Sequence, residues 1–259
     1  MAGAERYEQN MTFVTHAVAE AFLTTLEDAS VTLLATDPPY FGIVEETWDN
    51  QWSSTHAYVD WLVTILEMFQ RKLTPTGSIV FFQGFGKHGQ HPMFDVIKRL
   101  EKSYTFRNVI TWKKRRGYGK EFDYLYCREE IVWMSRSAER TGVVFNIPLT
   151  EQLRGYKGFN KDYPAKSEYK RVSNVWDDIG ELMKPERNAQ KPIELMERIV
   201  KTHSNPGDLV VDLFCGWGTT GVAALKNGRR FCGCEGIEKD AEAANGRCLA
   251  AKKEREAGS

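Results

Sequence analysis

The sequence predicts an α/β fold in which helices cover both faces of a mostly parallel sheet. Short apolar runs of strand length alternate with helix-like runs along most of the 259 residues, which is typical of parallel strands joined by crossover helices. Two of the short runs, residues 31–35 and 208–214, lead into turns that carry a carboxylate. A glycine-rich turn and a helix-like run follow the second one, and open α/β folds bind ligands at such strand ends.

The first apolar run brings the tetrapeptide Asp37-Pro38-Pro39-Tyr40 to the carboxyl edge of the predicted sheet. Each proline ring fixes its own φ, and Pro39 also favours an extended Pro38. Neither proline has an N–H group, so the turn presents carbonyl acceptors, a carboxylate and an aromatic face. We expect these groups to bind a planar molecule with an NH2 group, such as a nucleobase. An ordinary strand end is the alternative, because Asp-Pro and Pro-Pro pairs mark many turns.

The middle of the chain predicts one helix, one turn and three more strands. In chain order they cover residues 61–73, 74–77, 78–82, 106–113 and 130–134. The loop before this helix contains Trp48 and Trp52. We expect these two side chains either to cover a bound base or to pack the loop onto the sheet.

A second ligand-binding element is predicted near the C-terminus. The apolar strand 208–214 is followed by the glycine-rich turn 215–221, and the next strand ends on Glu235. This order lets a ligand approach backbone N–H groups at a helix N-terminus. A carboxylate at the end of the next strand is placed to accept hydrogen bonds from ribose hydroxyls.

The glycine turn also matches the fingerprint of NAD-binding proteins. Gly216, Gly218 and Gly221 have the G-x-G-x-x-G spacing, and Glu235 lies near the ~20-residue offset expected there. Asp212 counts against NAD, because its charge would face the pyrophosphate. A carboxylate suits the ammonium or sulfonium of S-adenosylmethionine better. A dehydrogenase also leaves the Asp-Pro-Pro-Tyr motif unexplained, so an NAD-dependent oxidoreductase stays only as an alternative.

Together these motifs resemble the amino-methyltransferases of DNA, in the permuted β class. In that family the Asp-Pro-Pro-Tyr motif precedes the cofactor glycine motif, and the resemblance covers most of the chain, including Gln190-Lys191-Pro192 before the last helices. It implies a Rossmann-like class I methyltransferase fold with circularly permuted motif order. It further implies a seven-stranded sheet with one reversed strand. One departure is Thr15-His16, where the family more often has Gly-Asp upstream of the catalytic strand.

The resemblance implies methyl transfer from S-adenosylmethionine to the N6 amine of an adenine that has left the DNA duplex. Asp37 and the Pro38 carbonyl would accept hydrogen bonds from the amine and localise its lone pair, while Tyr40 stacks on the base. The residues expected to hold the cofactor are Asp212, Phe214, Gly216, Gly218, Thr219, Thr220, Glu235 and, for its carboxylate, Lys191. Cytosine N4 is the alternative target, because both amines offer the same donors. A non-catalytic nucleic-acid-binding relative is a further alternative.

We expect a single domain, residues 1–259, made of a catalytic half (1–137), a variable segment (138–187) and a cofactor-binding half (188–259). The variable segment breaks the strand–helix pattern and mixes cations with aromatic residues near Arg154 and Lys157. Such a composition can grip phosphates and stack on bases. The resemblance implies that this interval holds target recognition; a surface loop without that role is the alternative.

Net charge is zero, so any DNA contact must come from local clusters of charge. The basic run Lys113, Lys114, Arg115 and Arg116 directly follows a predicted strand. We expect it on a loop at the sheet edge, where it neutralises phosphates. A solvated surface loop is the alternative.

Composition excludes several other classes of protein. The sequence has no apolar signal core and no run that could span a membrane. Five cysteines without zinc-like spacing predict reduced thiols, as in the cytoplasm of a bacterial cell or a phage-infected host. His88-x-x-His91 lacks a nearby carboxylate or cysteine, so no metal is expected. A homodimer and a restriction endonuclease partner both stay open.

Overall fold

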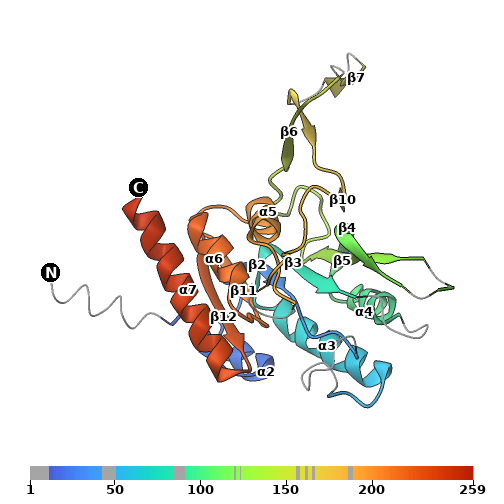
Figure 1. Cartoon of the computed structure of the whole chain (residues 1–259). Helices are drawn as coiled ribbons and strands as arrows, with labels where there is room; N and C mark the ends of the chain where they lie inside the picture. Colours follow the sequence, from blue (N-terminus) through green and yellow to red (C-terminus); the bar gives the residue numbers. More distant parts are fainter. Residues whose placement is uncertain are drawn as a thin grey trace.

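The computed structural model describes residues 12–42, 51–84, 91–119, 121–122, 124–155, 158–160, 163–164, 167–185 and 189–258. One large sheet organises them (Figure 1). Its strands are β1 (Val14–His16), β2 (Val31–Thr36), β3 (Leu73–Gln83), β4 (Thr105–Tyr118), β5 (Tyr126–Ser135), β10 (Val175–Trp176), β11 (Leu209–Asp212) and β12 (Arg230–Glu235). Their spatial order is β1-β12-β11-β2-β3-β5-β4-β10. Strand β5 pairs antiparallel with both neighbours, and the other pairings in this sheet are parallel.

The predicted fold class and the single reversed strand are confirmed. The sheet has eight strands among the described residues instead of seven, because the two-residue strand β10 pairs with the outer edge of β4. The predicted turn at residues 74–77 lies inside β3. The pairing of β3 with β2 is irregular in this stretch, because the register of the two strands shifts between Val31 and Leu33.

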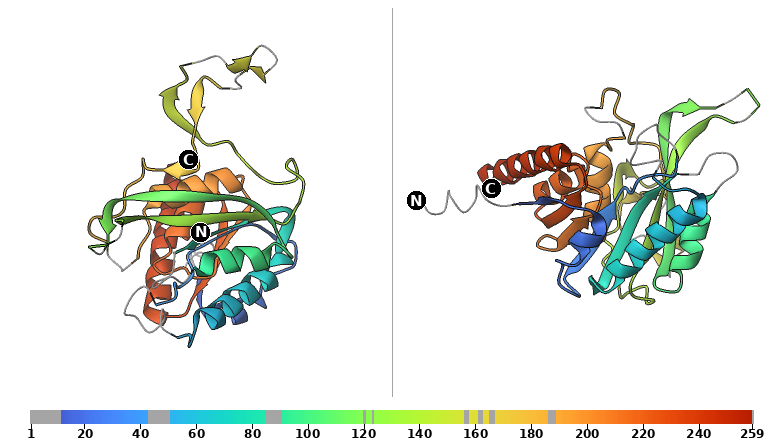
Figure 2. Two further views of the ribbon diagram at one scale, coloured as in Figure 1. Left: turned by 90° about the vertical axis from the view of Figure 1, so that its right-hand side faces the viewer. Right: turned by 90° about the horizontal axis from the view of Figure 1, so that it is seen from below.

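Helices cover both faces of the sheet (Figures 1 and 2). They are α2 (Ala19–Leu23), α3 (Thr55–Gln70), α4 (Pro92–Leu100), α5 (Ile193–His203), α6 (Thr219–Lys226) and α7 (Glu238–Ala257). Residues of α5, α6 and α7 form one core with the sheet, and those of α2, α3 and α4 form the other. Strand β2 contributes Leu33 to the first core and Leu34 to the second. It is buried along its whole length, as expected for a central parallel strand covered on both faces.

The variable segment contains two small antiparallel pairs. They are β6 (Leu149–Leu153) with β9 (Tyr169–Arg171), and β7 (Gly158–Asn160) with β8 (Tyr163–Pro164). Together they form an arm that projects from the body of the molecule (Figure 1). The arm begins beside α5, where the Asn146 side chain donates to the carbonyls of Lys201 and Ser204.

Two structural features, a membrane-spanning helix and a metal-binding cluster, are absent from the described residues. No helix among them is both long and apolar enough to cross a membrane. The described residues also contain no group of three or more His, Cys, Asp or Glu suited to a metal, and His88 lies outside them. All five cysteines are free thiols.

Candidate active site

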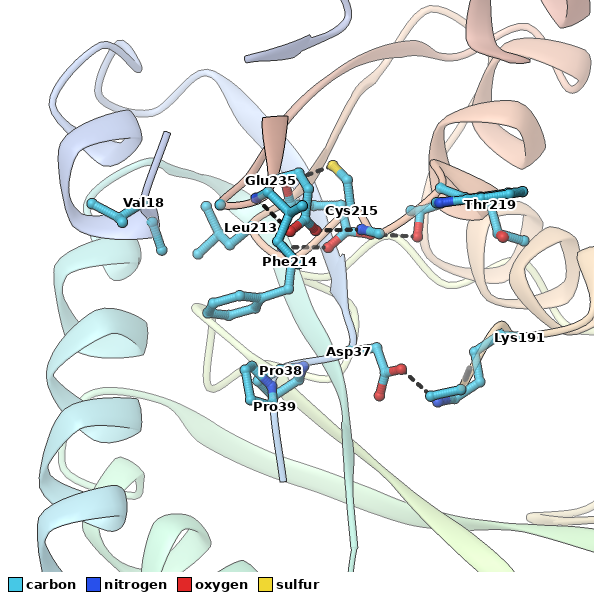
Figure 3. A pocket seen from close by; sticks show the side chains of 18 of the residues that line it. Val18, Asp37, Pro38, Pro39, Lys191, Leu213, Phe214, Cys215, Thr219 and Glu235 are labelled. Atoms are coloured by element: carbon cyan, nitrogen blue, oxygen red, sulfur yellow. Dashed lines mark hydrogen bonds and ion pairs between the residues drawn. The ribbon is translucent and has the colours of Figure 1, made fainter. Parts of the chain in front are cut away.

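A pocket of about 620 Å³ lies at the carboxyl ends of β2, β11 and β12. Residues from both ends of the chain line it, including Tyr40. Figure 3 shows Asp37 to Pro39 on one side and Cys215, Thr219 and Glu235 on the other. The sheet order explains this, because β2 lies directly beside β11. The two predicted motifs therefore share one cavity.

The Asp37 carboxylate is held by two side chains. The Tyr40 hydroxyl donates to its Oδ1 at 2.8 Å. Figure 3 shows the second contact, in which the Lys191 amino group donates to the Asp37 Oδ2 at 2.5 Å. Burial raises the pKa of Asp37 above its ordinary value, and the charge of Lys191 only partly offsets this. Its orientation is therefore fixed before any ligand binds.

Glu129 on β5 is a site residue that sequence reasoning missed. Its Oε2 lies 3.3 Å from the Lys191 amino group and 3.5 Å from the Tyr40 hydroxyl. Lys114 on β4 forms an ion pair with its other oxygen. Burial acts to raise the pKa of Glu129, but the charges of Lys191 and Lys114 outweigh it and the pKa lies below the ordinary value.

Lys191 lines the pocket, and Lys191 and Lys114 both have ion-pair partners that the sequence did not predict. Lys191, predicted to hold the cofactor's carboxylate, is paired with Asp37 and Glu129. Burial would lower the pKa of Lys191, but these two carboxylates raise it, so the amino group is charged. Lys114, predicted to contact phosphate, is paired with Glu129. Two carboxylates and two amino groups therefore balance their charges at this end of the pocket.

Asp212 fixes the turn at the other end of the pocket. Its carboxylate accepts hydrogen bonds from the Thr36 and Thr220 hydroxyls, each at 2.6 Å, and from the Phe214 N–H at 3.0 Å. The side chain is buried, and burial raises its pKa to about 6 although these hydrogen bonds act to lower it. Asp212 and Thr220 therefore hold β2, β11 and the start of α6 together while they line the pocket.

Glu235 points into the pocket in a preset orientation. Its Oε2 accepts from the Gly216 N–H at 2.7 Å and its Oε1 from the Ile237 N–H at 3.0 Å. Each oxygen keeps a lone pair for a further donor, such as a ribose hydroxyl. Phe214 and Thr219 also line the cavity.

Gly218 occupies a left-handed position as the N-cap of α6, with φ of 75°. Glycine is suited to this conformation because it has no Cβ. The turn leaves the first N–H groups of α6 at the pocket, where a negatively charged group is favoured. Trp217 stands beside it and donates its ring N–H to Asp240 at 2.8 Å, so α7 holds this unusual turn residue.

The loop tryptophans and the upstream strand can be placed only in part. The Trp52 ring packs edge-on against the Tyr58 ring, with 4.9 Å between the two ring centroids. Its centroid also lies 4.6 Å from that of the Trp61 ring. These contacts favour the packing role for Trp52. Trp48 lies outside the described residues. Thr15-His16 forms the end of the edge strand β1, and His16 pairs in register with Glu235.

Comparison with known proteins identifies the family. The sequence profile of the DNA methylase family, which covers N6 and N4 enzymes, matches residues 31–246. This range includes both predicted motifs and most of the chain. The chain belongs to the DNA methylase family.

Two curated relatives of this DNA methylase have comparable length. The chain is 30% identical to the type II methyltransferase M1.MboII of Moraxella bovis, covering 83% of this chain and 87% of that protein. It is 29% identical to the DNA adenine methyltransferase YhdJ of Escherichia coli K12, covering 89% of this chain and 80% of that protein. The predicted family is therefore confirmed.

Solved structures of DNA methylases share the fold. The putative DNA modification methylase TTHA0409 of Thermus thermophilus, solved with S-adenosyl-L-methionine, is 26% identical with a TM-score of 0.65 and covers 93% of this chain and 94% of its own. The cytosine-N4-specific PvuII DNA methyltransferase is 18% identical, with a TM-score of 0.70. The match covers 95% of this chain and 93% of the PvuII chain. At that identity the second likeness concerns the fold alone.

Among the basic residues predicted to contact DNA, none that the structure describes lines the pocket of this DNA methylase. Lys113, Arg115 and Arg116 are exposed, but they lie within β4 and not on a loop. Arg154 belongs to the arm, where its guanidinium donates to the Tyr169 carbonyl at 2.8 Å. Lys157 lies outside the described residues.

Proposed function

We propose that this DNA methylase transfers a methyl group from S-adenosylmethionine to the N6 amine of adenine in DNA. S-adenosylmethionine is the cofactor, and it occupies the part of the pocket formed by Glu235 and the glycine turn. The base occupies the part formed by Asp37 to Tyr40. The observation that carries this proposal is the shared cavity of about 620 Å³ that joins the two motifs, a volume typical of small-molecule sites.

Asp37 makes the amine a better nucleophile. The lone pair of an exocyclic amine is delocalised into the ring, and hydrogen bonds from the NH2 group to Asp37 and the Pro38 carbonyl localise it on nitrogen. The Tyr40 hydroxyl donates to Asp37 at 2.8 Å, so the ring is anchored at the site where it stacks on the base. A base reaches this site only after it leaves the duplex.

The transfer needs no covalent enzyme intermediate. The amine nitrogen attacks the methyl carbon in line while the bond from sulfur to methyl breaks, and S-adenosylhomocysteine leaves as a neutral thioether. Positive charge thus moves from sulfur to nitrogen, which then loses a proton. Asp37 is the acceptor beside that nitrogen, and burial raises its pKa in the direction that favours taking up the proton. Positioning supplies the remaining rate enhancement.

Nucleoside mass spectrometry on unmethylated DNA tests this function. The protein is incubated with S-adenosylmethionine, and Asp37→Ala is compared with Asp95→Ala, which removes an exposed carboxylate on α4 outside the pocket. We expect N6-methyladenine from the wild type and Asp95→Ala but not from Asp37→Ala. N4-methylcytosine would contradict the base assignment and leave the site intact.

Two other outcomes would contradict the proposal more deeply. Bound S-adenosylmethionine without any methylated nucleoside would favour a non-catalytic nucleic-acid-binding relative. Saturable binding of NAD in place of S-adenosylmethionine would favour an oxidoreductase. Calorimetric titration with each cofactor separates these cases without an activity measurement.

A further inference from the structure

Strands β4 and β5 continue past the sheet as a two-stranded ribbon (Figures 1 and 2). The ribbon comprises residues 113–128; Lys113 pairs with Arg128 and Tyr118 with Tyr126, and the register shifts between these two pairs. Its tip is the connection 119–125, of which residues 120 and 123 lie outside the described residues. None of the described residues that line the pocket belongs to this ribbon.

The base of the ribbon is attached to the catalytic motif. Lys114 pairs with Glu129, and Glu129 lies 3.3 Å from the Lys191 amino group that holds Asp37. Because β4 runs parallel to β2 and β3 through the reversed strand β5, it leaves the sheet at the edge that holds the pocket. Phe122 is seven positions before Glu129, so at ~3.3 Å per residue it lies at most roughly 23 Å from Glu129.

The tip exposes large apolar side chains. Phe122 is 95% exposed and Tyr124 is 94% exposed, and Leu125 is 67% exposed. Isolated exposed apolar residues are ordinary, but a cluster with a polar rim marks an interaction site. Leu125 also packs against the ribbon, because a Cβ on Gly117 would lie only 2.9 Å from the Leu125 Cβ.

Basic side chains line the ribbon strand that leads to this tip. Lys113, Arg115 and Arg116 are exposed on β4. Acidic groups also lie nearby: Glu121 is exposed beside Phe122 in the tip, and the Glu181 carboxylate accepts from the backbone N–H groups of Arg115 and Arg116. Cations along the ribbon and aromatic rings at the tip match the two parts of a nucleic acid, its phosphates and its bases.

We propose that the ribbon enters a groove of duplex DNA and that Phe122 and Tyr124 stack on bases next to the target nucleotide as it leaves the duplex. This inference rests on the proposed function. A two-stranded β-ribbon fits the major groove, and apolar side chains at such a tip can separate neighbouring bases. The ion pairs at the base of the ribbon hold its direction relative to Asp37, so the opened nucleotide lies on the side of the pocket.

A duplex needs opening and a single strand does not, so the two templates test the proposal. Methylation rates are measured on unmethylated plasmid DNA, either native or heat-denatured, for wild type and for Phe122→Ala/Tyr124→Ala. Phe94→Ala is the matched control, because this aromatic residue is 54% exposed and belongs to α4 instead of the ribbon. We expect the tip variant to lose about tenfold or more on native DNA, within the range of base–aromatic stacking. On denatured DNA we expect a rate within about twofold of wild type.

A second variant tests the contribution of the basic strand to DNA binding separately from that of the tip. Arg115→Gln/Arg116→Gln should weaken binding to native and denatured DNA alike. It should also make the slope of log K against log salt concentration shallower by about one to two units. Fluorescence anisotropy with a labelled duplex and its single strand measures this without catalysis. The same assay applied to the tip variant should show a loss confined to the duplex.

Three results would overturn the inference. Equal losses on native and denatured DNA would exclude action on the duplex, and unchanged rates and binding would exclude the ribbon as a DNA contact. A shift in sedimentation coefficient between wild type and the tip variant would instead assign the tip to an interface between two copies of the chain. If the wild type binds DNA but methylates neither template, the proposed function fails while the anisotropy results still decide the ribbon.

Discussion

At the scale of single residues, Lys191 controls the charge balance of the pocket. Its buried amino group lies between the carboxylates of Asp37 and Glu129. Removing one partner of a buried ion pair typically costs about 3–5 kcal/mol, because it leaves an uncompensated charge. Lys191 is thus a candidate both for orienting Asp37 and for holding the cofactor's carboxylate, and the two roles predict different measurements.

We expect Lys191→Met to lower the rate of methyl transfer by about 100-fold or more, the range for loss of one electrostatic contact to a reacting group. The dissociation constant of S-adenosylmethionine should change by less than about threefold, since the amino group is directed at Asp37. Single-turnover rates and calorimetry provide the two numbers. Lys226→Met is the control, because that lysine forms an exposed pair with Glu254. A large loss of cofactor affinity with a modest loss of rate would restore the role expected from the sequence.

Glu129→Gln tests the second carboxylate. It leaves Lys191 paired only with Asp37, so Asp37 becomes a weaker acceptor and we expect the single-turnover rate to fall by about tenfold. Glu130→Gln is a matched control on the same strand, because Glu130 is also buried but accepts from Thr111 instead of a pocket residue. Equal rates for the two variants would show that Glu129 has no influence on the reaction.

The sequence allowed Asp37 to be predicted but not Glu129. Asp37 follows its strand within a recognisable motif, so its neighbours along the chain reveal its position. Glu129 and Glu130 are consecutive and point to opposite faces of β5. Which one reaches Lys191 and Tyr40 depends on how β5 pairs with β3 and β4, and that pairing is a property of the folded sheet.

At the scale of elements, the turn before α6 depends on one left-handed residue. A Cβ on Gly218 would lie 3.0 Å from the Ala244 Cβ and 3.2 Å from its Cα, at a φ of +75°. Helix α7 therefore crosses this turn at a distance that only glycine permits. The turn geometry and the position of α7 are coupled.

We expect Gly218→Ala to destabilise the protein by about 1–3 kcal/mol and to weaken S-adenosylmethionine binding, because the helix N-terminus must shift. Gly246→Ala is the matched control inside α7, where an added Cβ meets nothing within 4 Å. That change should stabilise by about 0.5–1 kcal/mol. Chemical denaturation and calorimetry measure both effects. A Gly218→Ala protein with unchanged stability and cofactor affinity would contradict the coupling.

Strand β4 shows where local reasoning about elements fails. The basic run at residues 113–116 resembles a loop, and charged residues have low β-propensity. The observed strand continues to Tyr118 because β5 supplies a paired neighbour beyond the sheet. Tertiary pairing thus overrides local preference, whereas the apolar strands β2 and β11 were predictable from their own residues.

At the scale of the whole molecule, His203 links stability to pH. It is buried against Trp133 and Phe145, and its Nδ1 has no hydrogen-bond partner among the described residues. Burial lowers the pKa of His203 to about 3 from an ordinary value of 6.5. Between these values the unfolded chain binds the extra proton. The contribution of His203 is therefore complete above pH 6.5 and is lost as pH falls towards 3.

We expect the free energy of unfolding of the wild type to fall by about 2 kcal/mol more than that of His203→Phe between about pH 6.5 and pH 5, at ~1.4 kcal/mol per pH unit. Urea denaturation at a series of pH values provides the comparison. His56→Gln, at an exposed histidine on α3, should follow the wild type. Parallel curves for the wild type and His203→Phe would contradict the assignment.

The position of β2 between β11 and β3 has a consequence for synthesis on the ribosome. Strand β2 is translated well before its neighbour β11, which begins only at Leu209. Until then the growing chain carries an apolar strand with one open edge, the kind of surface that chaperones protect. The fold is thus completed only when the last part of the chain emerges, and a prematurely terminated product would be a target for aggregation or proteolysis.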